Sequence, residues 1–216
     1  SPFNLDIKKS VIAVLEIKPG ITFITTPNNP TGTSTPYDDL EKLAIACSEV
    51  KGLLVVDEAY AEFSQEKSAV NLIEQYPNVV VVRTMSKAFA FAGARVGYAV
   101  CNQAIVDAML VTRLPYHLSS TTQALALVAL DNSKALLAEV DALIAERDRV
   151  ATQLTKLGFE VSPSSANFLL FRGFKGDSKS AWESLVATGI LVRDVGLTGY
   201  LRVTIGLPSE NDEFLT

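Results

Sequence analysis

The sequence predicts an α/β fold, in which a mostly parallel sheet sandwiched by helices is followed by a smaller α+β domain. Three observations support this prediction. The strand segments of the first half are continuously apolar, as in "LLVV" (53–56) and "VVVV" (79–82), which is typical of strands buried on both faces. Amphipathic segments with helical spacing separate these strands, as a parallel sheet requires. The chain has 216 residues, 48 % of them hydrophobic, which is enough for a substantial core.

The first half alternates predicted strands and helices. "ITFITT" (21–26) is predicted to be a strand that ends at the turn "PNNPTG". A helix is predicted to begin with Thr35 as its hydroxyl cap, Pro36 in its first turn and Asp38 near the positive end of its dipole. The strand 53–56, a short helical stretch "NLIEQYP" and the strands 79–82 and 97–100 follow. The apolar face of the predicted helix has helical spacing and consists of Leu40, Leu43, Ala44 and Cys47.

The second half has a different pattern. Helices are predicted over 105–111 and 122–130, and one long helix over 132–157 that Gly158 ends. The short strands "NFLLF", "ILVRD" and "LRVTI" and one helix over 177–187 come after it. We therefore expect residues 1–133 to be part of a large domain, and residues 134–216 to be a small C-terminal domain that is incomplete at its end.

Composition and charge argue against several classes of function. The net charge of −5 and the pI of about 5.0 give no general affinity for nucleic acid or an anionic membrane, and no apolar run approaches the ~20 residues of a membrane span. Cys47 and Cys101 form no CxxC or Cys/His cluster, and His117 is the only histidine, so neither a disulfide framework nor a metal site is expected. The first residues lack a signal-peptide layout, so we expect a cytoplasmic protein with free thiols.

Polar side chains follow the predicted strands, at the carboxyl edge where ligands bind in such sheets. These are Asn29, Asp57, Tyr60 and Lys87. A lysine beside apolar walls and another cation loses its proton more readily, and its neutral amine is a nucleophile toward carbonyl carbons. A carboxylate that emerges from a buried strand needs a partner, and a protonated ring nitrogen would serve Asp57.

A phosphate-binding group is predicted next to this lysine. Arg95 has a planar fork suited to phosphate, and Thr84 and Ser86 have hydroxyl groups. A lysine that forms imines, an acid for a pyridinium and an arginine with hydroxyls for a phosphate are the needs of pyridoxal 5'-phosphate. Tyr60 and Asn29 would donate hydrogen bonds to the phenolate oxygen of its ring.

The motifs "PNNPTG", "DEAY" and "SKAFAFAGARVG", in this order, resemble those of the fold type I pyridoxal-phosphate-dependent aminotransferases. "NFLLF", "GILVRD" and "YLRVTIG" narrow the resemblance to the histidinol-phosphate aminotransferases, over nearly the whole chain. The resemblance implies that residues 1–133 belong to the cofactor-binding domain, and that Lys87 forms the Schiff base with the cofactor and shuttles a proton. It implies that Asp57 pairs with the pyridine nitrogen. The other implied cofactor contacts are Asn29, Tyr60, Thr84, Ser86 and Arg95.

The same resemblance implies residues on the substrate side. Arg202 would clamp a substrate's α-carboxylate, Arg193 would reach the substrate's phosphate, and Asn167 would line the same pocket. The implied reaction moves an amino group between histidinol phosphate and 2-oxoglutarate in histidine biosynthesis, from a small-molecule amino donor to a 2-oxo acid acceptor. Family members are homodimers, so we expect a homodimer of the intact protein. Taken singly, Asn29, Arg193 and Asn167 are better explained by turn and surface roles.

Two departures from the family leave alternatives open. The loop between Arg193 and Arg202 is short, which weakens the inference about the side group that is accepted. The chain also begins shortly before "ITFITT", so we expect it to lack the N-terminal portion of a longer enzyme. An aromatic amino-acid (phenylalanine) aminotransferase shares every quoted motif; a decarboxylase of a phosphorylated amino acid and a non-catalytic α/β fragment are further alternatives. No GxGxxG or GxxxxGK[ST] motif follows a strand, which argues against a nucleotide-binding module.

Overall fold

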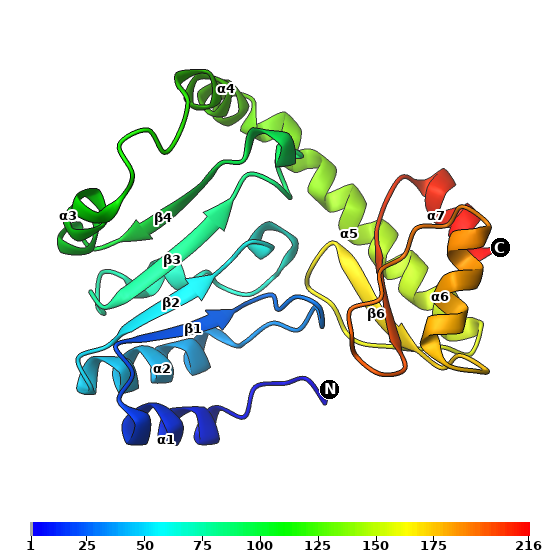
Figure 1. The fold of residues 1–216 in the computed structure, drawn as a ribbon, viewed down its shortest axis with the longest axis horizontal. Helices are drawn as coiled ribbons and strands as arrows, with labels where there is room; N and C mark the ends of the chain where they lie inside the picture. Colours follow the sequence, from blue (N-terminus) through cyan, green and yellow to red (C-terminus); the bar gives the residue numbers. More distant parts are fainter. Residues whose placement is uncertain (1) are drawn as a thin grey trace.

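The computed structural model, which describes residues 2–216, contains two separate β-sheets (Figure 1). The first sheet has the strand order β1-β2-β3-β4, in which β1 to β3 are parallel and β4 is antiparallel to β3. The mostly parallel α/β sheet predicted from the sequence is therefore confirmed. Its strands are β1 (Ile21–Thr25), β2 (Leu53–Asp57), β3 (Val79–Thr84) and β4 (Gly97–Cys101).

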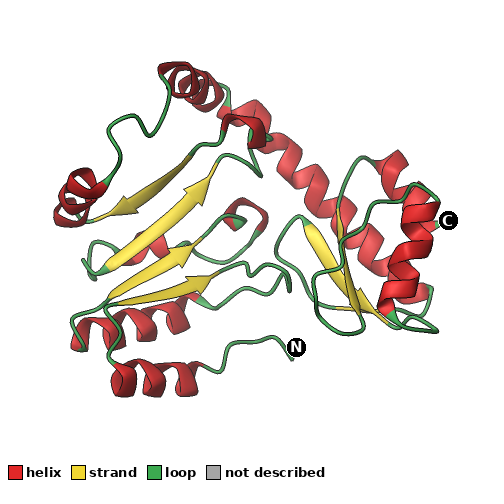
Figure 2. Ribbon diagram, viewed as in Figure 1, coloured by secondary structure: helices red, strands yellow, loops and turns green. Residues whose placement is uncertain are grey.

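Two helices, α1 (Ile7–Ile17) and α2 (Tyr37–Glu49), cover one face of the first sheet (Figure 2). Because successive residues of a strand point to opposite faces, every second side chain of β2 and β3 points toward these helices. The sheet side of this core is fully buried and includes Leu54, Val56, Val79 and Val81. The helix side is also buried, at the predicted spacing, and includes Leu40, Leu43, Ala44 and Cys47.

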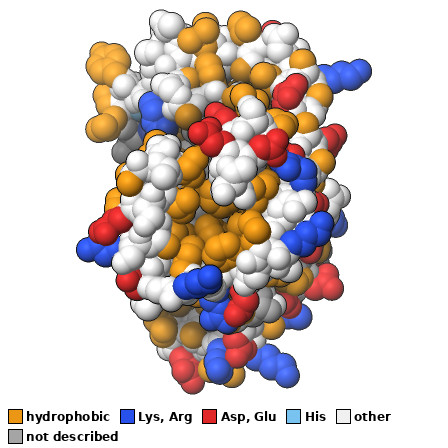
Figure 3. Space-filling view, turned by 90° about the vertical axis from the view of Figure 1, so that its right-hand side faces the viewer, with side chains coloured by type: hydrophobic (Ala, Val, Ile, Leu, Met, Phe, Trp, Pro, Cys, Tyr) orange, Lys and Arg blue, Asp and Glu red, His pale blue; other side chains and the backbone are white. Residues whose placement is uncertain are grey.

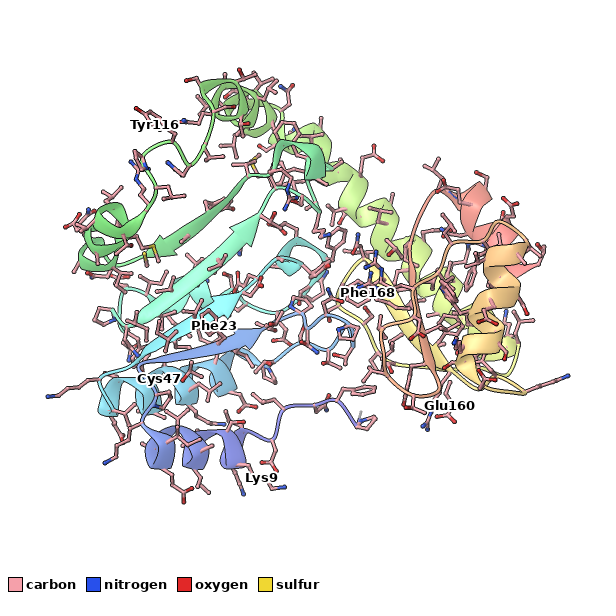
Figure 4. All side chains as sticks on the ribbon, in the orientation of Figure 1. Lys9, Phe23, Cys47, Tyr116, Glu160 and Phe168 are labelled. Carbon is pink, nitrogen blue, oxygen red and sulfur yellow. The ribbon has the colours of Figure 1, made fainter. Side chains whose placement is uncertain are left out.

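The opposite face of the first sheet is less covered by the described residues. Phe23 on β1, labelled in Figure 4, is 74 % exposed, although its neighbour Ile24 packs against the core under α1 and α2. The first three residues of β4 are exposed as well. Burial on this face is therefore uneven, because Phe23 is exposed whereas Val80 of β3, which lies on the same face, is buried.

The start of α2 differs from the prediction. Thr35 is not its cap: the N-cap residue is Pro36, which makes no side-chain cap hydrogen bond, and the helix begins at Tyr37. Thr35 is instead buried, and its backbone N–H donates to the Thr26 side-chain oxygen (2.9 Å). This bond links the end of the loop between β1 and α2 back to the start of that loop. Thr35 is therefore held by a contact with Thr26, and its hydroxyl does not cap the helix. The acid predicted near the positive end of the helix dipole, Asp38, does lie in the first turn.

The second sheet is small and antiparallel, with the order β5-β6-β7. The predicted strand "ILVRD" is wrong: only Arg193 forms a bridge there, to Arg202. In the glycine-containing segment around it, Gly189, Gly196 and Gly199 have positive φ, which breaks an extended strand. The strands are β5 (Glu160–Val161), β6 (Phe168–Arg172) and β7 (Tyr200–Thr204).

Helices pack around the second sheet and join it to the first. The long helix α5 (Ser133–Lys156) places Val150 and Leu154 against Leu169 of β6 and Leu201 of β7. Figure 3 shows the side of the molecule that carries α6 (Ser178–Ala187) and α7 (Pro208–Leu215), where apolar side chains lie in a hollow. The remaining helices are α3 (Gln103–Thr112) and α4 (Ser120–Asp131), with the short 3₁₀ helices η1 (Ala61–Phe63), η2 (Ala69–Leu72) and η3 (Ala92–Ala94).

Within residues 2–216, none of the helices combines the length and the apolar character that crossing a bilayer requires. The same residues contain no cluster of three histidine, cysteine, aspartate or glutamate side chains arranged to hold a metal ion.

Candidate active site

The candidate site begins at the carboxyl ends of β2 and β3, where Asp57 and Thr84 are the last residues of neighbouring strands. Asp57 lies opposite Val82 in the parallel register. Because side chains alternate along a strand, Thr84, two residues beyond Val82, points to the same face of the sheet as Asp57. The Asp57 carboxylate accepts a hydrogen bond from the backbone N–H of Ala59 (3.0 Å), which fixes one of its oxygens. Lys87 follows Thr84 in an exposed turn. The structure thus places an acid, a hydroxyl and an amine at one sheet edge.

Tyr60 joins this edge to the second sheet. It is buried, and its ring meets that of Phe168 edge-to-face, with 5.2 Å between the ring centroids. The Lys87 Nζ lies 5.7 Å from the centroid of the Tyr60 ring. Burial raises the pKa of the Tyr60 phenol, Arg202 lowers it and Asp57 raises it. The net rise keeps the hydroxyl protonated at neutral pH, so that it can donate a hydrogen bond.

The residues predicted for phosphate binding lie in the connection between β3 and β4. Thr84 Oγ1 donates to Ser86 Oγ (2.9 Å) and accepts from the Ser86 backbone N–H (3.1 Å). Arg95 is exposed, has a left-handed backbone (φ +54°), and donates from Nη1 to the Ala92 carbonyl oxygen (3.1 Å). Gly97 follows, and a Cβ there would lie 2.6 Å from the Arg83 carbonyl oxygen. The two hydroxyls are therefore paired with each other, and the arginine is on the same short connection.

Arg202 reaches from the second sheet to the loop after β1. Its Nη1 donates to Asn29 Oδ1 at 2.6 Å, and its guanidinium carbon lies 4.8 Å from the centroid of the Phe168 ring. Its Nε is buried and has no hydrogen-bond partner within residues 2–216. Burial lowers the pKa of Arg202, the Tyr60 phenol raises it and Arg193 lowers it. A buried donor of this kind needs a hydrogen-bond acceptor.

The other two predicted substrate-side residues adjoin Arg202. The backbones of Arg193 and Arg202 pair by two 2.9 Å hydrogen bonds, and their side-chain charges repel each other. Asn167 precedes Phe168, and its carbonyl oxygen accepts from the Ile205 N–H (2.9 Å). The structure brings both residues to the strands that present Arg202, with Arg193 exposed to solvent.

Two features of this site were not predicted. Phe168 was expected only as part of a strand, yet its ring packs against Tyr60 and under Arg202. The hydrogen bond between Arg202 and Asn29 joins residues 173 positions apart. The alternation of side chains along "NFLLF" places Phe168 and Leu170 on one face of that strand, but it does not show what that face meets.

The loop that presents Asn29 is shaped by Gly32. Its φ of +77° is in the left-handed region, and a Cβ at this position would collide with the Ser164 side chain. The Ser165 N–H also donates to the Gly32 carbonyl oxygen (2.8 Å). A glycine is therefore required both by the turn and by the close approach of the segment before β6.

The model of a protein family described as "Aminotransferase class I and II" matches residues 2–216. A histidinol-phosphate aminotransferase of Mycolicibacterium smegmatis is 54 % identical over 214 residues, which cover 99 % of this chain and 56 % of that relative. One from Nocardia farcinica is 54 % identical over 214 residues, covering 99 % of this chain and 54 % of that relative. The chain thus spans about half the length of the curated relatives it matches.

Solved structures share the fold. The histidinol-phosphate aminotransferase of Clostridium acetobutylicum has a TM-score of 0.89 and 26 % identity, with 98 % of this chain and 66 % of that chain covered. The Sinorhizobium meliloti enzyme of the same name, in complex with pyridoxal-5'-phosphate, has a TM-score of 0.87 and 26 % identity, with 98 % and 60 % covered. A decarboxylase from Sulfurospirillum multivorans has a TM-score of 0.87 and 25 % identity, with 99 % and 64 % covered. Since this fold occurs in proteins of different activity, the reaction has to be argued from the site.

Proposed function

This chain belongs to the class I and II aminotransferase family, and from that membership we propose that its full-length protein transfers an amino group between histidinol phosphate and 2-oxoglutarate in histidine biosynthesis. The single observation behind the choice of substrate is the 54 % identity, over 99 % of the chain, to proteins that bear the name histidinol-phosphate aminotransferase. The solved structures, at 25–26 % identity, support the fold and not the substrate.

The donor set at the sheet edge fits pyridoxal 5'-phosphate, the group named for the Sinorhizobium meliloti structure. An amine, a carboxylate and a protonated phenol lie together at Lys87, Asp57 and Tyr60. The buried Nε of Arg202 lacks a partner within residues 2–216, which is the orphaned donor expected where an anionic substrate is to bind beside the cofactor. When bound, the cofactor supplies a ring that accepts electrons from the substrate's α-carbon.

Each residue then has a defined task. Asp57 would hold a proton on the ring nitrogen. The Tyr60 hydroxyl would donate a hydrogen bond to the ring's phenolate oxygen. Asn29 would donate a second one from Nδ2, because its side-chain oxygen already accepts from Arg202. Lys87 Nζ would hold the cofactor covalently and, as a free amine, take the proton from the substrate's α-carbon as a general base. The phosphate would be bound by Thr84, Ser86 and Arg95.

The arginines suit both substrates. Glutamate and 2-oxoglutarate have carboxylates, whereas histidinol phosphate has a phosphoryl group, so each substrate presents an anion to the site. Arg202 would bind the α-carboxylate through its fork, Arg193 the phosphoryl group of histidinol phosphate, and Asn167 would line the same pocket. The negative charge of a bound substrate would relieve the mutual repulsion of the Arg193 and Arg202 side chains.

The test is a comparison of amino donors with the full-length protein and 2-oxoglutarate as acceptor. We expect histidinol phosphate to be used with the higher kcat/KM, and Lys87→Ala to abolish transfer. Preference for phenylalanine would identify an aromatic amino-acid aminotransferase instead, and release of carbon dioxide from a phosphorylated amino acid would identify a decarboxylase. The homodimer, the cytoplasmic location and the domain boundary at residue 134 stay predictions.

A further inference from the structure

A buried carboxylate, Glu58, lies between Asp57 and Tyr60 in sequence but faces the other way. It is 3 % exposed. Successive residues of a strand point to opposite faces, so the Glu58 side chain follows Val56 toward the core under α2, whereas Asp57 points to the face of the candidate site. Glu58 belongs to the "DEAY" motif, yet it has no task in the proposed reaction.

Four hydrogen bonds converge on the Glu58 carboxylate. Oε2 accepts from Arg83 Nη2 (2.7 Å), Arg83 Nε (3.1 Å) and Ser68 Oγ (2.8 Å), and Oε1 accepts from the Ala69 N–H (2.7 Å). Arg83 also donates from Nη1 to Glu62 Oε1 (3.3 Å) and from Nη2 to Ser68 Oγ (3.0 Å). One guanidinium of β3 is thus shared by two carboxylates of the segment that follows β2.

The ion pair continues the connection between β2 and β3 beyond their backbone pairing. The ladder between these strands ends with the bond from the Glu58 N–H to the Val82 carbonyl oxygen (2.9 Å). After it, the chain beyond β2 turns away into η1, and β3 runs on beside β4. Arg83 immediately precedes Thr84 and lies four residues before Lys87. The Glu58–Arg83 pair therefore joins the two segments where they present their site residues and begin to separate.

We propose that the Glu58–Arg83 ion pair is a positioning device, which sets Asp57 and Tyr60 relative to Lys87 from the face of the sheet opposite to the cofactor. This inference rests on the proposed function. Stability alone does not require the pair, because a buried ion pair is often no more stabilising than apolar residues of the same volume. Two donors of one guanidinium, Arg83 Nη2 and Nε, instead converge on one carboxylate oxygen, Glu58 Oε2, and this charge-assisted contact restrains the distance between the two chain segments.

The test uses full-length protein loaded with pyridoxal 5'-phosphate and two readouts. The first is the pH midpoint of the absorption band of the cofactor bound at Lys87, which responds to the groups around the ring. The second is the division of any loss between kcat and KM. The variants are Glu58→Gln, and Glu58→Gln combined with Arg83→Gln, because removal of both charges avoids an unpaired buried ion.

We expect both variants to shift the midpoint by about half a pH unit or more. We also expect kcat to fall about tenfold while KM changes less than about threefold, as a small displacement of reacting groups does. The matched control is Glu146→Gln, which removes a carboxylate that also binds one arginine twice, Arg149 (2.6 and 2.9 Å), and one further donor, Asn211 Nδ2 (3.0 Å). We expect it to lower the melting temperature without moving the midpoint.

Three outcomes decide the question. If the Glu58 variants fold, melt at lower temperature and keep the parent's midpoint and kcat, the pair is only structural and the inference is overturned. If neither folds, Ser68→Ala decides, since it removes one donor to Glu58 and one acceptor of Arg83; a smaller shift in the same direction supports the inference and an unchanged midpoint overturns it. If the parent protein shows no cofactor band, the proposed function fails instead.

Discussion

Arg202 of β7 donates a 2.6 Å hydrogen bond to Asn29 Oδ1, in the loop that follows β1. This bond joins the second sheet to the first across 173 positions of sequence. On the same guanidinium, the Phe168 ring lies 4.8 Å away and Nε is buried without a partner within residues 2–216. The proposed role of this cation is to bind a substrate carboxylate with the guanidinium donors that Asn29 does not use.

Arg202→Met should therefore weaken binding of 2-oxoglutarate. Loss of a two-point contact to a carboxylate corresponds to about 3 kcal/mol, so we expect KM for this substrate to rise by roughly 100-fold. Steady-state kinetics of the full-length protein measure it. Arg172→Met is the matched control, because Arg172 on β6 also lies over an aromatic ring, that of Tyr200 (5.4 Å), but its guanidinium bonds the exposed Glu160. An equal rise of KM in both variants would contradict the assignment.

Tyr60→Phe removes the hydroxyl and keeps the ring, so it should separate the contribution of the hydroxyl to catalysis from the contribution of the ring to stability. The phenyl ring keeps its contact with Phe168, so we expect the free energy of unfolding to change by less than about 1 kcal/mol. The lost hydrogen bond to the cofactor should lower kcat by about tenfold. Because burial raises the pKa of Tyr60 above that of an ordinary phenol, kcat of the parent should show no loss from its ionisation between neutral pH and about pH 9. A fall in this range that Tyr60→Phe removes would show that the phenol ionises there.

Gly32→Ala should destabilise the loop that presents Asn29. The new Cβ would meet the Ser164 side chain, and alanine is disfavoured at a φ of +77°. We expect a loss of about 1–3 kcal/mol in the free energy of unfolding by urea. At Gly20 a Cβ would meet no atom within 4 Å, so Gly20→Ala is the control and should stay within about 0.5 kcal/mol of the parent. Equal effects at both glycines would show that the contact with Ser164 is unimportant.

The contact between α5 and α7 should weaken in acid. The hydrogen bond from Arg149 holds the pKa of Glu146 below its ordinary value, although burial opposes this, and Asn211 lowers the pKa further. A carboxyl whose pKa is depressed on folding contributes stability above its unfolded pKa, and the contribution is lost as the pH falls through the folded value. The difference in urea unfolding between the parent and Glu146→Gln should thus be largest near pH 7 and should shrink below about pH 4. A difference that stays constant from pH 7 to pH 3 would contradict this cause.

Local patterns in the sequence predicted the first sheet well. The continuous apolar runs at 53–56 and 79–82 became β2 and β3, and Val79, Val80 and Val81 are buried although they point alternately to the two faces of the sheet. The rule that parallel strands bring their carboxyl ends to one edge also predicted the shared location of Asp57 and Lys87. Their roles, unlike their placement, stay predictions.

Contacts that depend on how the two sheets meet could not be predicted. The bond of Asn29 to Arg202 and the packing of Phe168 on Tyr60 join distant segments, and no periodicity encodes them. The Glu58–Arg83 pair, in contrast, leaves a pattern in the sequence. Each charge lies two residues beyond a buried valine of an apolar strand, on the same face, and a charge in such a position needs a partner. Reading the face on which each charge falls would have suggested that these two residues meet.

The central claim is that Lys87 Nζ binds pyridoxal 5'-phosphate covalently. The most direct measurement is borohydride reduction of the full-length protein in the presence of this cofactor, followed by proteolysis and mass spectrometry of the peptides. We predict a phosphopyridoxyl group on Lys87, and its absence from Lys87→Ala. Modification of a different lysine, or of none, would contradict the account.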